Sequence, residues 1–158
     1  MSTSETQKQY AYIVGVYAGE DYNTYRVIFN NTAGNLYLVN GNSKASSDSR
    51  GVGNRAINEI HEATIKNGSV VFDGTTYETP TQGSALPSST KLSICANSTG
   101  TIPARARIYS VKVTKDGVVK AEFVPARNSS DVVGMYDLVR GQFFTNAGTG
   151  TFVAGPEM

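Results

Sequence analysis

The sequence predicts an all-β fold of antiparallel strands arranged as a two-sheet sandwich, and three observations support it. Gly, Ser, Thr and Asn make up 59 of the 158 residues and only 17% are charged, a composition that disfavours long solvated helices. Short runs rich in β-branched and aromatic residues alternate with turn-forming residues. No segment keeps a helical apolar stripe for three turns. At this length we expect a single domain over residues 1–158.

The first half contains three runs with strand character, over residues 10–17, 25–29 and 36–39. A loop at 19–23 and a turn at 30–34 separate them. Residues 40–54 are rich in Gly, Ser and Asn without periodicity, which predicts a long exposed loop. Residues 55–66 contain β-branched side chains and precede Asn67-Gly68, which favours a strand entering a hairpin.

The register of the first hairpin follows from its apolar residues. A two-residue turn at Asn67-Gly68 pairs Ile65 with Val70 and Ala63 with Phe72, and it places His61 on the same face. A three-residue loop would set Glu62 opposite Phe72, a charge on an apolar face. The two-residue loop is therefore predicted.

The second hairpin is predicted to differ. A two-residue turn at Asp116-Gly117 would pair Val113 with Lys120 and Val111 with Glu122. A three-residue loop over residues 115–117 instead pairs Val113 with Val119, Val111 with Ala121 and Tyr109 with Phe123. Because this second register keeps the apolar face intact, we expect the three-residue loop.

The C-terminal third carries four motifs in order: Ile108-Tyr-Ser, Phe123-Val-Pro, Gly134-Met-Tyr-Asp137 and Phe144-Thr-Asn-Ala-Gly-Thr-Gly-Thr-Phe152. This order resembles the end of the concanavalin A-like, laminin-G-like jelly-roll domains of phage tail (receptor-binding) and bacterial surface proteins. The resemblance is specific over residues 105–155 and looser back to Tyr10. It implies an antiparallel two-sheet jelly-roll sandwich and, for most of the family, binding rather than catalysis.

The chain departs from this family at its beginning. Members usually open with a strand pair of the form Y-I-x-S-x-G-x-Q-Y-I-D-T-G, which is not found here. The chain is therefore expected to enter the fold a strand or two late, as a C-terminal module or fragment of a longer assembly. Residues 141–155 contain no Lys, Arg, Asp, Glu or Pro, so an unprotected sheet edge is expected there. Self-association or a partner chain would complete the sheet.

Composition excludes several classes of function. The 14 Lys and Arg residues balance 13 Asp and Glu residues, so nucleic acid and acidic membranes are not expected partners. No apolar run approaches the roughly 20 residues of a membrane span, and the polar N-terminal stretch shows no signal peptide. The single cysteine, Cys95, excludes an intrachain disulfide and a multi-Cys zinc site. We expect it to be a buried small apolar residue.

Catalytic chemistry finds little support. His61 is the only histidine, and without a His-Glu-x-x-His motif it is expected to be a hydrogen-bonded sheet residue. Glycosidases need two facing carboxylates about 5–10 Å apart, whereas Glu59 and Glu62 would lie on opposite faces of a strand. We therefore expect no enzyme activity and no cofactor. A weak calcium site stays open, since some laminin-G-like domains bind calcium through loop carboxylates.

One stretch of the chain suits sugar recognition. Aromatic faces pack on pyranose C–H groups, while amides and carboxylates bind hydroxyls. Residues 17–25 contain aromatic rings as well as amide and carboxylate groups. The candidate ligand-binding residues there are Tyr17, Asp21, Tyr22, Asn23 and Tyr25. The alternative is that Tyr17 and Tyr25 belong to the flanking strands and pack within the sheet.

A second candidate rim lies in the Gly- and Ser-rich stretch, at Asn42, Asp48 and Arg50. The favoured function is thus non-catalytic binding of a glycan or cell-surface ligand by a phage structural or bacterial surface protein. Its location would be a virion or extracellular surface. The first alternative is a structural virion decoration module that makes only protein–protein contacts, and the second is a glycoside-active enzyme.

Overall fold

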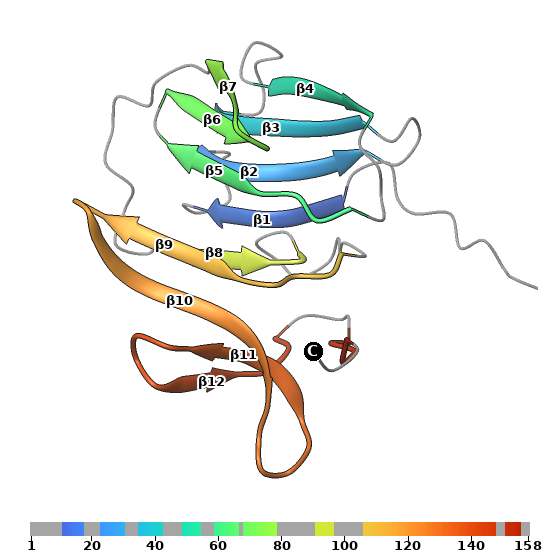
Figure 1. Cartoon of the computed structure of the whole chain (residues 1–158), viewed down its shortest axis with the longest axis vertical. Helices are drawn as coiled ribbons and strands as arrows, with labels where there is room; N and C mark the ends of the chain where they lie inside the picture. Colours follow the sequence, from blue (N-terminus) through green and yellow to red (C-terminus); the bar gives the residue numbers. More distant parts are fainter. Residues whose placement is uncertain are drawn as a thin grey trace, which may run out of the picture. The chain divides into compact units, whose positions relative to one another are not determined.

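A computed structural model describes residues 11–17, 23–30, 35–42, 49–54, 59–66, 68–78, 91–96, 106–147 and 151–155. Within these ranges every regular element is a β-strand and every strand pairing is antiparallel (Figure 1). The all-β prediction is confirmed. The chain divides into two compact units, residues 1–105 and 106–158, which are described in turn.

The first unit contains a five-stranded sheet in the order β4-β3-β2-β1-β8. Its strands are β1 (Ala11–Tyr17), β2 (Asn23–Asn30), β3 (Asn35–Asn42), β4 (Ser49–Asn54) and β8 (Lys91–Ile94). The first four form a meander in which each strand pairs with the next, and β8 returns to pair with β1. The strands expected over residues 10–17, 25–29 and 36–39 are present as β1, β2 and β3.

The expected long loop over residues 40–54 is wrong at both ends. β3 continues to Asn42, and residues 49–54 form β4 at the edge of the sheet. Gly51 pairs with Tyr37 and Arg50 with Leu38. Low intrinsic strand propensity misled the prediction here, because an open neighbouring strand offers backbone partners whatever the side chains are.

The three-stranded sheet of this unit runs β5-β6-β7, with β5 (Ala63–Lys66), β6 (Ser69–Phe72) and β7 (Thr75–Glu78). Ile65 pairs with Val70 and Ala63 with Phe72, so the predicted register of the first hairpin is confirmed. The strand expected over residues 55–66 is shorter than predicted, since β5 begins only at Ala63. Residues 55–58 lie outside the described part.

The described core of the first unit lies on one face of β6. Val70 is completely buried and Phe72 nearly so, and they alternate with half-buried neighbours. Ile65 and Tyr77 flank Val70 from the adjacent strands, and Ile13 of β1 packs against the same cluster. The contact with Ile13 joins the three-stranded sheet to the five-stranded one, so the unit has two packed β layers.

The second unit contains a four-stranded sheet in the order β12-β11-β10-β9. Its strands are β9 (Val111–Lys115), β10 (Val118–Arg127), β11 (Val133–Asp137) and β12 (Gln142–Phe144). Tyr109, which was expected to pair with Phe123 in this sheet, lies before β9 and has a 41% exposed side chain. The motif that ends at Pro125 lies in β10, and the motif that ends at Asp137 lies in β11, in the predicted order.

The predicted register of the second hairpin is wrong. Asp116 and Gly117 form a two-residue turn with φ values of 52° and 74°, and the positive φ at both positions suits a type I′ turn. Val118 pairs with Lys115, and the register then shifts by one residue between Val119 and Ala121. This bulge at Lys120 restores the apolar face further along the strands.

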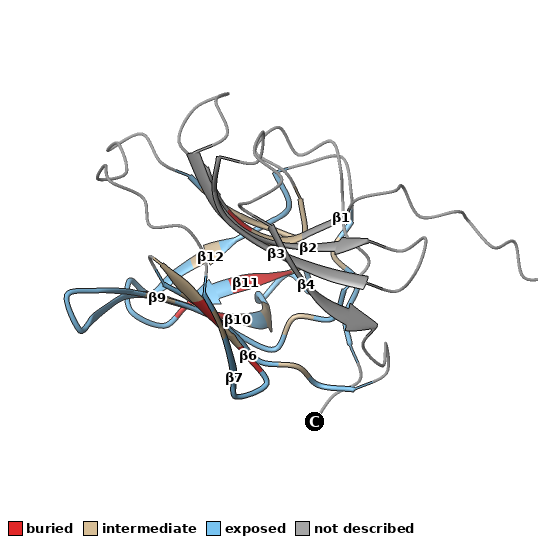
Figure 2. Ribbon diagram, turned by 90° about the horizontal axis from the view of Figure 1, so that it is seen from above, coloured by how far each residue is buried: buried red, intermediate tan, exposed pale blue. Residues whose placement is uncertain are grey.

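Beyond the bulge, Val113 pairs with Ala121 and Val111, rather than Tyr109, pairs with Phe123. Ala121, Phe123 and Val111 are buried together with Met135, as the burial colours in Figure 2 show for β10 and β11. The ring of Phe144 meets that of Phe123 edge to face, with centroids 5.7 Å apart. The apolar face is thus kept, although by a bulge in the strand and not by a longer loop.

Candidate functional site

Some of the predicted glycan-contacting residues lie at one end of the five-stranded sheet. Tyr17 is the last residue of β1 and pairs with Thr24 of β2. Asn23 begins β2 and pairs with Asn42, the last residue of β3. β4 begins at Ser49. The chain therefore leaves β1 and β3 and enters β2 and β4 at the same end of the sheet.

The other predicted residues fall in two groups. Tyr25 and Arg50 lie within strands, where Tyr25 pairs with Asn40 and Arg50 with Leu38. Three lie outside the described residues: Asp21, Tyr22 and Asp48. The structure thus brings Tyr17, Asn23 and Asn42 to one sheet end, and it places Tyr25 and Arg50 within β2 and β4.

The only histidine forms a pair with an aspartate. His61 Nδ1 lies 2.8 Å from Asp73 Oδ2, and the imidazole stacks on Phe72 with ring centroids 5.4 Å apart. The other carboxylate oxygen of Asp73 accepts the backbone N–H of Glu62 at 3.0 Å. The prediction of a hydrogen-bonded histidine is confirmed, although His61 lies before β5 and not within a strand.

Asp73 belongs to the turn that joins β6 to β7. Asp73 and Gly74 have φ values of 47° and 78°, and aspartate is one of the few residues with a side chain that tolerates this region. Its backbone N–H donates to the Glu62 carbonyl at 3.0 Å, which closes the segment around His61. The Asp73 carboxylate therefore links the segment just before β5 to the β6–β7 turn. Its contact with His61 Nδ1 also restrains the imidazole.

The acidic residues near His61 do not form the arrangement considered for catalysis. Glu59 and Glu62 are both exposed and precede β5, so the expectation that they lie on opposite faces of a strand is wrong. Within the described ranges, no three side chains of His, Cys, Asp or Glu lie together as ligands for a cation.

Cys95 follows β8 in a left-handed conformation, with φ of 57°. Its N–H donates to the carbonyl of Ile13 at 2.7 Å. The side chain is half-buried, and burial raises the pKa of its thiol to about 11. Because the thiolate is the reactive form, this thiol is a weak nucleophile at neutral pH.

Asp137 of the Gly134-Met-Tyr-Asp137 motif is a completely buried carboxylate in the second unit. It accepts N–H groups of Glu122 at 3.2 Å and Val139 at 3.0 Å, and Arg140 Nη1 at 3.2 Å. Burial alone would raise the pKa of this carboxyl. Backbone N–H donation from Glu122, Val139 and Arg140, with the Arg140 charge, outweighs burial and holds the pKa below its usual value.

The loop between β10 and β11 is held by its own side chains. Asn128 Oδ1 accepts the N–H groups of Ser130 and Val132, both at 3.0 Å. Arg127 and Asp131 form an ion pair at 2.6 Å, and Asp131 has φ of 63°. These contacts form an Asx-type turn that sets where β11 begins. Asn128 is thereby a structural residue of this loop.

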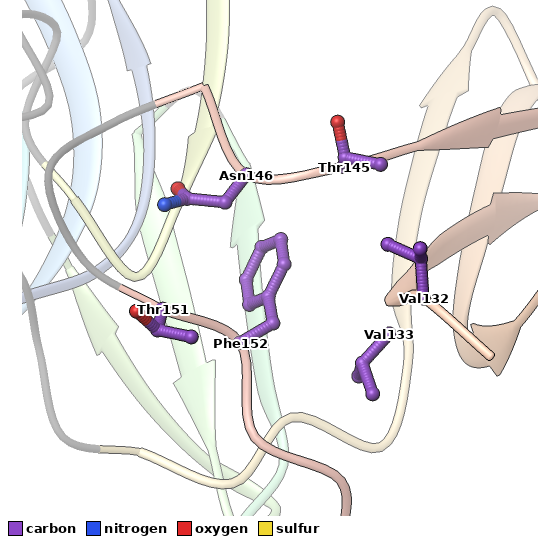
Figure 3. Close-up of a pocket in the computed structure, with 6 residues that line it drawn as sticks. All are labelled: Val132, Val133, Thr145, Asn146, Thr151 and Phe152. Atoms are coloured by element: carbon purple, nitrogen blue, oxygen red, sulfur yellow. The ribbon is translucent and has the colours of Figure 1, made fainter. Parts of the chain in front are cut away.

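A depression of about 350 Å³ lies beside this loop (Figure 3). In Figure 3 the ring of Phe152 lies between Val132 and Val133 on one side and Asn146 and Thr151 on the other, while Thr145 lies on the side of the valines. The polar members are Thr145, Asn146 and Thr151. Sequence reasoning missed this site because it used the residue 143–152 motif only for family resemblance and for an expected edge. The Asn and Thr residues flanking Phe152 were the available signal.

The chain matches no protein-family model, no curated protein and no solved structure. In the described ranges there is also no helix long and apolar enough to cross a membrane.

Proposed function

We propose that this chain is a non-catalytic binding module for a glycan or another cell-surface ligand, built as a jelly-roll sandwich of the concanavalin A-like type. One observation carries the proposal. Among the candidate sugar-binding residues, Tyr17 ends β1, Asn23 begins β2 and Asn42 ends β3, all at the same end of the five-stranded sheet. Residues of both candidate stretches, 17–25 and 40–54, are thereby found at one sheet end, where Asn23 pairs with Asn42.

The chemistry of this rim suits a carbohydrate. Tyrosine rings supply flat surfaces for the C–H faces of a pyranose, and amide or carboxylate groups bind hydroxyls in pairs. Loops positioned by a rigid sheet are the usual carriers of binding residues. The resemblance of residues 105–155 to phage tail and bacterial surface modules adds the location, a virion or an extracellular surface. Assembly into a longer polypeptide or with a partner chain fits the same setting.

Substitution of Tyr22 by alanine tests the proposal. We expect Tyr22→Ala to weaken binding to a glycan array or to host cells by at least about tenfold, with the melting temperature nearly unchanged. Tyr109→Ala is the matched control, since Tyr109 is an exposed tyrosine of the other unit. Equal binding by Tyr22→Ala and the unsubstituted chain would contradict the proposed rim.

Metal removal and turnover provide further checks on the proposal. We expect glycan binding to persist in EDTA and a labelled polysaccharide to stay intact during incubation. Loss of binding that calcium restores would show a required cation site, and release of labelled fragments would show a glycosidase. Either result would replace the non-catalytic, metal-independent function proposed above.

A second candidate function is supported by a different observation. β12 is an edge strand of the four-stranded sheet, Phe144 on it is 42% exposed, and residues 141–155 carry no charged residue or proline. Such an edge can accept a further strand. We propose as the alternative a structural module that assembles through this edge with a partner chain or a second copy, without binding a glycan.

A further inference from the structure

The chain contains two Asp-Gly pairs, Asp73-Gly74 and Asp116-Gly117, and both occupy the same kind of turn. Each pair connects two antiparallel strands, β6 and β7 in the first case and β9 and β10 in the second. The φ values are 47° and 78° in the first turn and 52° and 74° in the second. A Cβ added at either glycine would meet nothing within 4 Å. The two backbones are thus closely matched, and a difference in chemistry between them must come from the aspartate side chains.

The carboxylate of Asp73 is held at both of its oxygens. Oδ2 lies 2.8 Å from His61 Nδ1, and Oδ1 accepts the backbone N–H of Glu62 at 3.0 Å. The backbone N–H of Asp73 in turn donates to the carbonyl of Glu62 at 3.0 Å. These bonds fix both the side chain and the main chain of Asp73, so its carboxyl carbon cannot turn toward the next peptide nitrogen unless they open.

The carboxylate of Asp116 is in a different situation. Asp116 is exposed at the tip of the β9–β10 hairpin. Among the residues that the structure describes, none makes a hydrogen bond or an ion pair with its side chain. The side chain is therefore free to rotate, and the nitrogen of Gly117 follows it directly in the chain without a neighbouring side chain to hinder approach.

We propose that Asp116 is a site of spontaneous isomerisation to isoaspartate, and that the contacts of Asp73 with His61 and Glu62 protect Asp73 from the same reaction. The nitrogen of Gly117 attacks the side-chain carboxyl carbon of Asp116. A bond forms between these two atoms, and the amide proton leaves with the carboxyl hydroxyl as water. The product is a five-membered succinimide ring.

Water then opens the ring at one of its two carbonyl carbons. Cleavage of the new bond restores Asp116, whereas cleavage of the original peptide bond leaves the chain connected through the side-chain carbon, as isoaspartate. The water lost in the first step is regained in the second, so the composition is unchanged and no other reactant is needed. Isoaspartate adds one carbon to the main chain of a turn whose two-residue geometry sets the pairing of Lys115 with Val118. The reaction therefore disturbs the end of this hairpin without a change in mass.

The test is peptide mapping of the full 158-residue chain after prolonged incubation in mildly acidic buffer, below its melting temperature. An endoproteinase that cleaves before aspartate but not before isoaspartate reports the reaction at each site. We expect a progressive loss of cleavage before Asp116. The loss before Asp73 should be at least about tenfold slower, since hydrogen bonds to a charged group must first open. Equal rates at the two sites, or full cleavage before Asp116 throughout, would overturn the proposal.

The same incubation in concentrated urea shows whether the fold sets the difference. Unfolding removes the contacts of Asp73 with His61 and Glu62, so both sites should then lose cleavage at similar rates. An Asp73 site that stays slow in urea would place its protection in the local sequence, which would contradict the role assigned to these contacts.

A substitution isolates the contribution of the histidine. His61→Ala removes the contact with Asp73 Oδ2, so isomerisation at Asp73 should become several-fold faster, while the rate at Asp116 in the same chain stays unchanged. Glu59→Ala is the matched control, because Glu59 is an exposed residue of the same segment, and it should leave both rates as they are. An unchanged rate at Asp73 in His61→Ala would overturn the protection by His61.

Discussion

At the scale of single residues, the carboxylate of Asp137 shows why a charged side chain can occupy an apolar face. It pairs with Phe123 on the sheet and is completely buried, a position that would be unfavourable for an isolated charge. Backbone N–H groups of Glu122, Val139 and Arg140, together with the Arg140 guanidinium, take the place of water around it. The same bonds join β10, β11 and the turn after β11, so one side chain organises three segments.

Asp137 should make the second unit sensitive to acid. Because its pKa in the folded chain is lowered, its contribution to stability is complete above the unfolded value of about 3.9 and is lost as the pH falls through the folded value. Asp137→Asn should lower the melting temperature by several degrees at pH 7. Thermal unfolding between pH 7 and pH 2 should show this difference shrinking in acid. A difference that grows in acid would contradict the argument.

Gly134 of the same motif is explained by close packing. A Cβ at this position would lie 2.7 Å from Phe143 Cζ and closer still to the carbonyl oxygen of Phe144. Gly134→Ala should therefore destabilise the chain by about 1–3 kcal/mol, as overpacking usually does. Gly155→Ala is the control, since a Cβ there meets nothing nearer than Arg107 Nε at 4.0 Å. Similar denaturation midpoints for the two variants would contradict this account.

At the scale of elements, the two hairpins show what local sequence can predict. The Asn67-Gly68 register followed from the apolar pattern alone, because a single loop length aligned Ile65 with Val70. At Asp116-Gly117, the two-residue turn that these residues favour did not align the apolar residues of the two strands. The chain meets both by adding a bulge at Lys120, a solution that comparison of loop lengths did not include.

The corrected register changes which residue supports Phe123. Phe123 is buried and pairs with Val111, so Phe123→Ala should cost about 3–5 kcal/mol. Tyr109 was expected opposite Phe123, but it precedes β9 and is 41% exposed. Tyr109→Ala should therefore cost less than about 1 kcal/mol. Chemical denaturation gives the free energy of unfolding of each variant. Equal losses of stability in the two variants would support the three-residue loop instead.

At the scale of the whole molecule, composition predicted the fold class, because the fold class depends on many residues at once. The placement of single site residues depended on long-range pairing that local patterns do not contain. β4 formed from a stretch with weak strand propensity because β3 offered a template. The depression at Phe152 is lined by residues on either side of 147–150 and by the β10–β11 loop, so only the folded chain brings its residues together.

The edge at β12 leads to an expectation about assembly. We expect the 158-residue chain to self-associate at micromolar concentration, because residues 141–155 lack the charges and prolines that discourage strand addition. Gln142→Lys on β12 should shift the chain toward monomer in light scattering. Thr114→Lys on β9, the other edge strand of this sheet, is the matched control. A stable monomer without any substitution would contradict this expectation.

The bulge at Lys120 also bears on how the length of this hairpin can vary. Val119 pairs with Thr114 before the bulge and Ala121 pairs with Val113 after it, so consecutive residues of β9 meet β10 residues on either side of Lys120. Removal of Lys120 would make the ladder continuous and leave every other partner in place. Related chains could therefore differ here by one residue and still bury Ala121 and Phe123. A gap at this point of an alignment would mark no change in fold.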